Sequence, residues 1–233
     1  SMNFTRHLWE IGQFYDNATT PDACPFVTGA STADRYGCPD TDGDYYSDGD
    51  ENWTIENGSD AFPVEPSQWV DTDRDGWGDN QSEGALLIDD FPQNPTQWRD
   101  TDEDGWGDNQ TYGATQVDAF PFVPSQYRDS DGDGYGDNGS EGATNPDRFP
   151  DNVAAAEDND SDGHPDRWTD SYNVTDNSTE NDGDGLVLDG CPGVFGNSTS
   201  PYPGCPDSDG DGWMDSQDKF PTEPTQWLDF DDD

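Results

Sequence analysis

The sequence predicts an irregular fold with little helix or sheet and no conventional hydrophobic core. Three observations predict it. Acidic residues dominate, because 54 Asp and Glu against 8 Lys and Arg give a formal net charge of −46. Leu, Ile, Val and Phe together number 29 of the 233 residues, a share typical of disordered chains. Yet one acidic pattern recurs at a regular interval, and this regularity indicates a built structure.

The recurring pattern is clearest at residues 71–80, DTDRDGWGDN. Neighbouring carboxylates about 4 Å apart repel each other by roughly 4 kcal/mol at an effective dielectric near 20, so this spacing indicates a bound cation. A calcium loop takes side-chain oxygens from positions 1, 3, 5, 9 and 12 and a backbone carbonyl from position 7, with Gly at position 6. The loop that begins at Asp71 has this arrangement up to position 9.

The same loop begins again at residues 100, 129 and 158, so its starts lie 29 residues apart. Further loops begin at Asp40, with Tyr45 in place of the position-6 Gly, at Glu180, with Leu188 in place of the position-9 acid, and at Asp207. The expected ligands, with the position-7 residue giving its carbonyl, are Asp40, Asp42, Asp44, Tyr46 and Asp48; Asp71, Asp73, Asp75, Trp77 and Asp79; Asp100, Asp102, Asp104, Trp106 and Asp108; Asp129, Asp131, Asp133, Tyr135 and Asp137; Asp158, Asp160, Asp162, His164 and Asp166; Glu180, Asp182, Asp184, Leu186 and Asp189; and Asp207, Asp209, Asp211, Trp213 and Asp215.

Between the loops lies a second motif, which we call the join. An Asp stands two residues before an aromatic–Pro pair, and Pro-x-Gln-aromatic follows. In residues 207–218 this Asp falls at position 12 of the loop, so the join identifies the closing ligand of the other loops as well. Residues 80–88, 109–117 and 138–146 are then excursions between position 9 and the closing ligand. The predicted closing ligands are Asp60, Asp89, Asp118, Asp147 and Asp218, while Asp170 and Asp176 both remain candidates for the Asp158 loop.

With these motifs in view, the chain resembles a thrombospondin type 3 repeat array from about Asp16 to the C-terminus. Its Pro-x-Gln-Trp variant is similar to arrays in large surface proteins of marine archaea and bacteria. The resemblance implies an irregular chain wrapped around several calcium ions. Both ends of the sequence cut through the pattern, so we expect one continuous array from a longer protein, with a partial repeat at 3–39 and tandem repeats at 40–233.

Metal binding to a site that the unfolded chain lacks counts directly as folding free energy. We therefore expect a loosely extended chain without calcium and a rigid one with it. The strong negative charge excludes nucleic acid and anionic membrane as partners. No apolar string is longer than that at residues 85–88, which is too short to insert in a membrane.

The four cysteines form two pairs with the same spacing, at equivalent places in the pattern. Three connectivities are possible, and the equivalent places favour the local pairs Cys24–Cys38 and Cys191–Cys205. Disulfides in an acidic chain with a small core predict an extracellular or cell-surface location. Eleven of the 15 Asn lie in N-x-S/T sequences, and the repeated ones are also good turn residues, so both roles stay open. The candidate glycosylation sites are Asn80, Asn109, Asn138, Asn173 and Asn197.

No enzyme is expected, because no Ser or Cys nucleophile has a His partner: His7 and His164 lie far apart in the sequence. The leading hypothesis is a structural module, a calcium-rigidified stalk or spacer linked to neighbouring domains of the same chain. The alternative is an adhesin segment that binds a glycan or protein through its excursions or aromatic residues. A helix–loop–helix sensor is disfavoured, because the Pro-rich joins exclude flanking helices.

Overall fold

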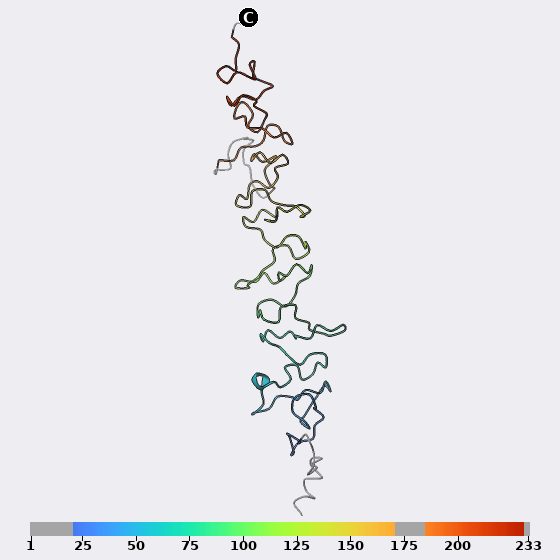
Figure 1. The fold of residues 1–233 in the computed structure, drawn as a ribbon. Helices are drawn as coiled ribbons and strands as arrows, with labels where there is room; N and C mark the ends of the chain where they lie inside the picture. The colour runs from blue at the N-terminus through green and yellow to red at the C-terminus, as the bar shows by residue number, and fades with distance from the viewer. Residues whose placement is uncertain (1–20, 171–184, 231–233) are drawn as a thin grey trace, which may run out of the picture. The chain divides into compact units, whose positions relative to one another are not determined.

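The structure is a computed structural model that describes residues 21–170 and 185–230. The described chain is irregular, as predicted (Figure 1). In this part of the chain the one helical element is a three-residue 3-10 turn, η1 (Ile55–Asn57), and strand pairing is limited to isolated bridges such as Gly78 with Ile88. Five of the candidate site residues lie outside the described residues, namely Asn173, Asp176, Glu180, Asp182 and Asp184.

The irregularity has a local cause. Asp side chains accept the backbone N–H groups that a helix or a sheet would otherwise use, and this competition is typical of Asp in turns. In the loop that begins at Asp71, for example, the N–H groups of Arg74, Gly76 and Trp77 all go to Asp carboxylates. The hydrogen-bond donors of the loops are thus satisfied without regular secondary structure.

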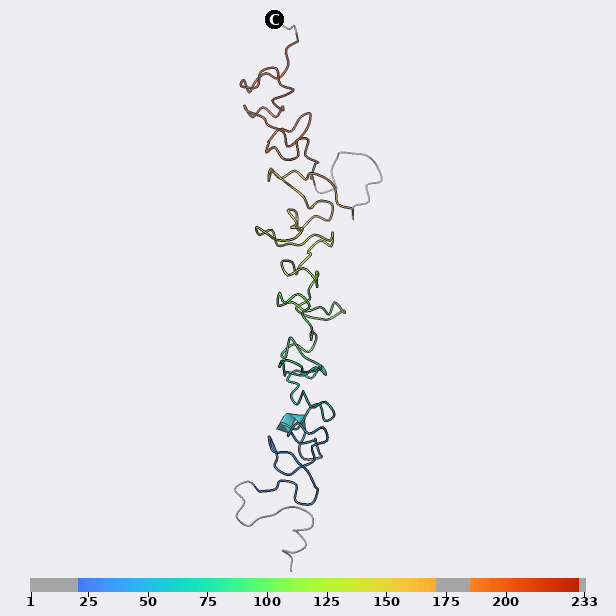
Figure 2. The same ribbon diagram turned by 90° about the vertical axis from the view of Figure 1, so that its right-hand side faces the viewer.

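The chain divides into two compact units, Ser1–Val117 and Asp118–Asp233. Within each unit, the colours of Figures 1 and 2 follow the sequence in order, so each repeat meets the next one along the chain. The hydrogen bonds agree: in the first unit Gln68 reaches Leu86, 18 residues on, and in the second Arg167 reaches back 32 residues to Tyr135. Each unit is therefore a linear array of neighbours, as in solenoid proteins.

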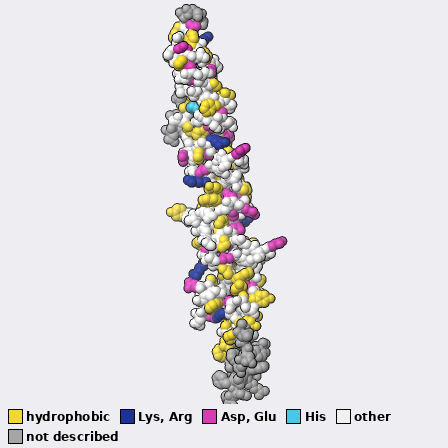
Figure 3. All heavy atoms as spheres, in the orientation of Figure 1, with side chains coloured by type: hydrophobic (Ala, Val, Ile, Leu, Met, Phe, Trp, Pro, Cys, Tyr) yellow, Lys and Arg dark blue, Asp and Glu magenta, His cyan; other side chains and the backbone are white. Residues whose placement is uncertain are grey.

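Polar residues supply most of the buried side chains in the described chain. The buried apolar side chains there are small, namely those of Ala154, Ala155, Ala156, Pro165 and two cysteines, whereas Gln and Asp account for the larger buried groups. On the face drawn in Figure 3, apolar side chains form small separate groups among acidic and other polar atoms. The described residues thus have no conventional hydrophobic core, as the composition predicts.

A buried glutamine in the join fixes each nine-residue excursion. The Gln68 amide nitrogen donates to the carbonyls of Asn80 (3.0 Å) and Leu86 (2.7 Å), and its oxygen accepts the Asn80 N–H (2.9 Å). Gly78 leaves room for this amide. Equivalent bonds hold the next two excursions, through Gln97 and Gln126.

In the two stapled joins, cysteines stand where the other joins have their aromatic residues. Cys24 pairs with Cys38 and Cys191 with Cys205, which confirms the predicted local pairing. In the first stapled join, the buried Ser31 hydroxyl accepts the Cys38 N–H at 2.9 Å. The equivalent hydroxyl in the second stapled join accepts the Cys205 N–H at 3.0 Å. A buried polar side chain therefore organises both kinds of join.

The aromatic residues pack between successive loops. The position-7 ring of a loop stacks on the aromatic ring of the following join, as in Trp77 with Trp98, whose centroids lie 6.0 Å apart at 6°. Where Ala156 takes the place of that second ring, the Tyr135 hydroxyl instead accepts a hydrogen bond from Arg167 (3.0 Å), which is ion-paired with Glu157. Tyr46 with Trp69 and Trp213 with Trp227 stack in the same way.

Candidate metal centres

The loops share one hydrogen-bond pattern that positions their carboxylates. In the Asp71 loop, the two Asp71 oxygens accept the N–H groups of Arg74 (2.6 Å) and Gly76 (3.1 Å), and Asp75 accepts the N–H of Trp77 (2.9 Å). These bonds hold positions 1 and 5 on the same side of the turn. The pattern recurs in the loops that begin at Asp40, Asp100, Asp129, Asp158 and Asp207.

Position 9 has a bracing role in this pattern. The two Asp79 oxygens accept the N–H (3.1 Å) and the hydroxyl of Thr72, and the Asp79 N–H donates to the Val70 carbonyl (3.0 Å). In two other loops an Arg side chain also lies beside the position-9 carboxylate, at a distance of 3.6 Å or less. Position 9 of a calcium loop often binds through water, which fits a carboxylate that is already engaged. The Arg pairs are Arg99 with Asp108 and Arg128 with Asp137.

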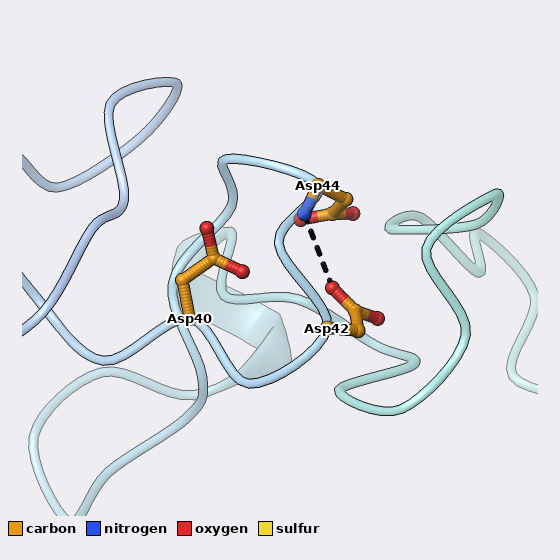
Figure 4. Close-up of side chains that lie close together, drawn as sticks. All are labelled: Asp40, Asp42 and Asp44. Carbon is orange, nitrogen blue, oxygen red and sulfur yellow. Dashed lines mark hydrogen bonds between the residues drawn. The ribbon is translucent and has the colours of Figure 1, made fainter.

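The carboxylates at positions 1, 3 and 5 converge. In each such group, one oxygen atom per residue lies within 4.8 Å of the others, close enough for one cation to contact all three. Figure 4 shows the first group, with the hydrogen bond from the Asp44 N–H to Asp42 that keeps two members together. Five of these groups are Asp40, Asp42 and Asp44; Asp71, Asp73 and Asp75; Asp100, Asp102 and Asp104; Asp129, Asp131 and Asp133; and Asp158, Asp160 and Asp162.

The closing residues that the join register predicts return to their loops. The Asp89 N–H donates to the Gly78 carbonyl at loop position 8 (3.0 Å), and one Asp89 oxygen accepts the N–H of Phe91 (2.7 Å). The excursion therefore leaves and re-enters the loop at one point, and the closing carboxylate sits beside the triplet. Asp60, Asp147 and Asp218 make the same pair of bonds.

Many oxygens at these sites are buried yet have no hydrogen-bond partner. Asp89 is 0% exposed, Asp60 2% and Asp147 3%, and the second oxygen of each is unpartnered. An unsatisfied buried polar group costs free energy, so a ligand that contacts these oxygens would relieve that cost. The positions-3 and -5 residues with an unpartnered buried oxygen are Asp42, Asp44, Asp73, Asp75, Asp102, Asp104, Asp131, Asp160, Asp209 and Asp211.

Burial and mutual repulsion also shift the pKa values of these acids. Burial raises the pKa of Asp60 and of Asp147 to about 7, and that of Asp89 and of Asp133 to about 6. The charges of neighbouring loop carboxylates add to the shift of each. The donor set consists of oxygen atoms only, which suits hard divalent cations. The repeated groups can therefore hold metal ions.

Asp118 lies on the boundary between the two compact units. It belongs to the second unit, whereas the Asp100 loop, for which it is the predicted closing ligand, belongs to the first. Asp118 is fully buried, and its carboxylate accepts the N–H of Phe120 at 2.7 Å. The other closing residues likewise accept the N–H of the residue two positions later. Its local conformation is thus that of the other closing residues.

Two acids that precede Cys–Pro pairs adopt the closing conformation as well. Asp189, which linear spacing assigns to the Glu180 loop, donates its N–H to the carbonyl of Pro165 at position 8 of the Asp158 loop (2.9 Å). The Asp22 carboxylate accepts the N–H of Cys24 (2.8 Å), the bond typical of a closing residue. The signal was present in the sequence, because each acid stands two residues before Cys–Pro.

The repeated Asn residues of the excursions have a structural role. The side-chain nitrogens of Asn80, Asn109 and Asn138 donate to backbone carbonyls of the preceding join at 2.7–2.8 Å, and all three residues are half-buried. Their side-chain oxygens accept the N–H two residues on at 3.1 Å, which is the turn role that the sequence left open beside glycosylation. Asn197, by contrast, is exposed.

Among the described residues, no helix has both the length and the apolar character needed to cross a membrane. The sequence matches no known family model, and no curated protein matches it.

Proposed function

We propose that this chain is a calcium-binding structural module that serves as an extracellular stalk or spacer. The observation that carries the proposal is the set of buried, unpartnered carboxylate oxygens beside each Asp triplet, such as those of Asp73, Asp75 and Asp89. Protein folding leaves few buried polar atoms unsatisfied, and here they recur at the same loop positions. Their recurrence supports a common ligand for all the loops.

Calcium is the cation that this donor set fits best. It takes 6–8 oxygen ligands in flexible geometry, whereas magnesium demands a near-ideal octahedron and keeps several waters. The Asp71 loop offers carboxylates at positions 1, 3 and 5, the closing Asp89 and the carbonyl of Trp77. The thrombospondin type 3-like motifs in the sequence support the same choice.

The position of the closing residue links each site to the rigidity of the chain. Asp89 belongs to the join, whose Trp98 stacks on Trp77 of the same loop. A cation shared by the loop and Asp89 would neutralise the repulsion between them, and the join would then keep a fixed place against the loop. Since the described residues lack a conventional hydrophobic core, this binding free energy counts directly toward folding.

An extracellular setting suits both the disulfides and the proposed metal. Disulfides persist in oxidising compartments, and both staples are formed here. Extracellular calcium modules bind with dissociation constants of about 10⁻⁴–10⁻³ M. Ambient calcium of about 1 mM would then keep the array ordered, and its removal would soften it.

Small-angle scattering combined with near-ultraviolet circular dichroism tests the proposal. With calcium at about 1 mM, we expect a stable particle with a strong aromatic signal from the stacked pairs. Excess chelator should enlarge the particle and remove that signal, and added calcium should restore both. Magnesium at the same ionic strength is the control. Profiles that are identical with and without calcium would refute the module proposed here.

A further inference from the structure

The site that begins at Asp158 differs from the others in how it closes. Its first three acids form the usual triplet. The residue at linear position 12, however, is Thr169, whose hydroxyl donates to the Val153 carbonyl at 2.6 Å. Asp170, one of the two closing candidates from the sequence, is exposed. Neither residue supplies this triplet with a buried carboxylate.

Asp189 has every feature of a closing residue, although it lies 23 residues beyond position 9. Its N–H bonds the Pro165 carbonyl at position 8 of the loop (2.9 Å), and one oxygen accepts the Cys191 N–H (2.7 Å). The residue is 7% exposed, and its second oxygen is buried without a hydrogen-bond partner. These features match those of Asp89 in the Asp71 loop.

The Asp189 carboxylate also lies next to the triplet. A Cβ on Gly204 would lie 2.3 Å from an Asp189 oxygen and 3.0 Å from an Asp162 oxygen, so both carboxylates border the same small space. Burial raises the pKa of Asp189, and the charges of Asp162, Asp160 and Asp166 raise it further. The His164 ring nitrogen lies 3.1 Å from the Val187 carbonyl, which brings the residues just before Asp189 to the loop.

We infer that Asp189 is the closing ligand of the Asp158 cation site and that the stapled join Cys191–Cys205 forms one wall of that site. The inference rests on the proposed function, because it assigns a ligand to one of its sites. It replaces both closing candidates from the sequence, and it removes Asp189 from the Glu180 loop.

The stapled join contributes backbone contacts to this wall. The Gly196 N–H donates to Asp162 (3.3 Å), and Gly204 lies against both carboxylates, where no side chain fits. The Gly190 N–H donates to the carbonyl of Pro203 (2.8 Å), which closes the join on itself beside Asp189. The Cys191–Cys205 disulfide thus holds the backbone that packs against the site.

Counting bound calcium by equilibrium dialysis of the full chain tests the inference. We expect Asp189→Asn to lose one ion per chain, as the comparison variant Asp89→Asn loses one at its own site. Asp170→Asn and Asp176→Asn should keep the wild-type count. Amide NMR shifts between metal-free and calcium-loaded protein should disappear in residues 158–166 of Asp189→Asn and persist in residues 71–79.

Gly204→Ala provides a second variant that keeps all carboxylates. Its Cβ would intrude between Asp189 and Asp162, so we expect at least a tenfold loss of affinity at the Asp158 site. Gly37→Ala is the matched control, because Gly37 has the equivalent place and a similar φ (79° against 75°) in the first stapled join. It should leave the Asp158 site unchanged.

The outcomes separate the two proposals. If Asp89→Asn loses an ion while Asp189→Asn retains the full count, the assignment of Asp189 is wrong and the calcium module stands. Loss of the ion in Asp170→Asn or Asp176→Asn would also overturn the assignment. A wild-type chain that binds no calcium would refute the proposed function, and this inference with it.

Discussion

Gln68 and Gly78 fit so closely that a Cβ on Gly78 would lie 2.1 Å from the Gln68 side-chain oxygen. The contact links the Pro-x-Gln-aromatic part of the join to position 8 of the following loop. The same contact recurs at Gln97 with Gly107 and at Gln126 with Gly136. A fully buried amide is thus a feature that these three joins share.

The first prediction concerns this amide. Gln68→Ala would leave the Asn80 N–H and the carbonyls of Asn80 and Leu86 without their partner. Unsatisfied buried groups cost about 1–3 kcal/mol each, so we expect the free energy of unfolding in calcium to fall by roughly 2 kcal/mol or more. Chemical denaturation measures this change. Gln226→Ala is the matched control, because Gln226 has the same motif position but is exposed; equal losses in the two variants would contradict the clamp.

The second prediction concerns Tyr45, which has a left-handed φ of 82° at position 6, where the other described loops have Gly. A side chain in this conformation costs roughly 1–2 kcal/mol of stability. Gly removes this strain, but its greater freedom in the unfolded chain offsets part of the gain. Tyr45→Gly should therefore stabilise the calcium-loaded chain by about 0.5–1 kcal/mol, measured by thermal or chemical unfolding.

Gly76→Ala is the reverse test of the same idea. The added Cβ meets nothing within 4 Å, and Gly76 has a φ of 95°, so its cost is conformational. We expect a loss of about 1 kcal/mol. If Tyr45→Gly destabilises the chain while Gly76→Ala has no effect, backbone strain at position 6 has no part in the stability of these loops.

The sequence predicted the parts of this protein that repeat at fixed spacing. The irregular fold, the Asp triplets and the disulfide pairing all follow from local patterns of residues such as Asp71, Asp73 and Asp75. The role of Gln68 was not predicted, because its partners lie 12–19 residues away and no local pattern marks a buried amide. For Asp189, spacing along the chain points to the Glu180 loop and the join motif to another loop, and its bond to the Pro165 carbonyl favours the join motif.

The third prediction concerns proton competition at the closing residues. The pKa of Asp60 and of Asp147 is about 7 in the folded chain, against an ordinary value of 3.8. Between these values the folded chain binds more protons than the unfolded one, so stability without metal rises as the pH falls from 7 toward 4. Calcium needs the ionised form, so calcium affinity should fall over the same range.

Calcium titrations followed by circular dichroism at pH 8, 7, 6 and 5 would measure this competition. We expect the midpoint to move to higher calcium at each lower pH, with the largest change near pH 6–7, where Asp60, Asp89, Asp133 and Asp147 take up protons. A midpoint that stays constant from pH 8 to 5 would show that these carboxylates do not contact the ion.

The fourth prediction is a change of sign at Asp89. Without calcium, the buried Asp89 charge is repelled by Asp75, Asp73 and Asp79, so Asp89→Asn should stabilise the metal-free chain above pH 7. With calcium, the same substitution removes a ligand, and the chain should become less stable than wild type. Unfolding midpoints with chelator and with calcium measure both arms. Glu83, an exposed acid in the excursion that precedes Asp89, is the control, and Glu83→Gln should shift neither arm appreciably. Destabilisation by Asp89→Asn in both conditions would mean that Asp89 serves packing alone. The charge of a residue that binds the cation stabilises the chain when calcium is present and destabilises it when calcium is removed.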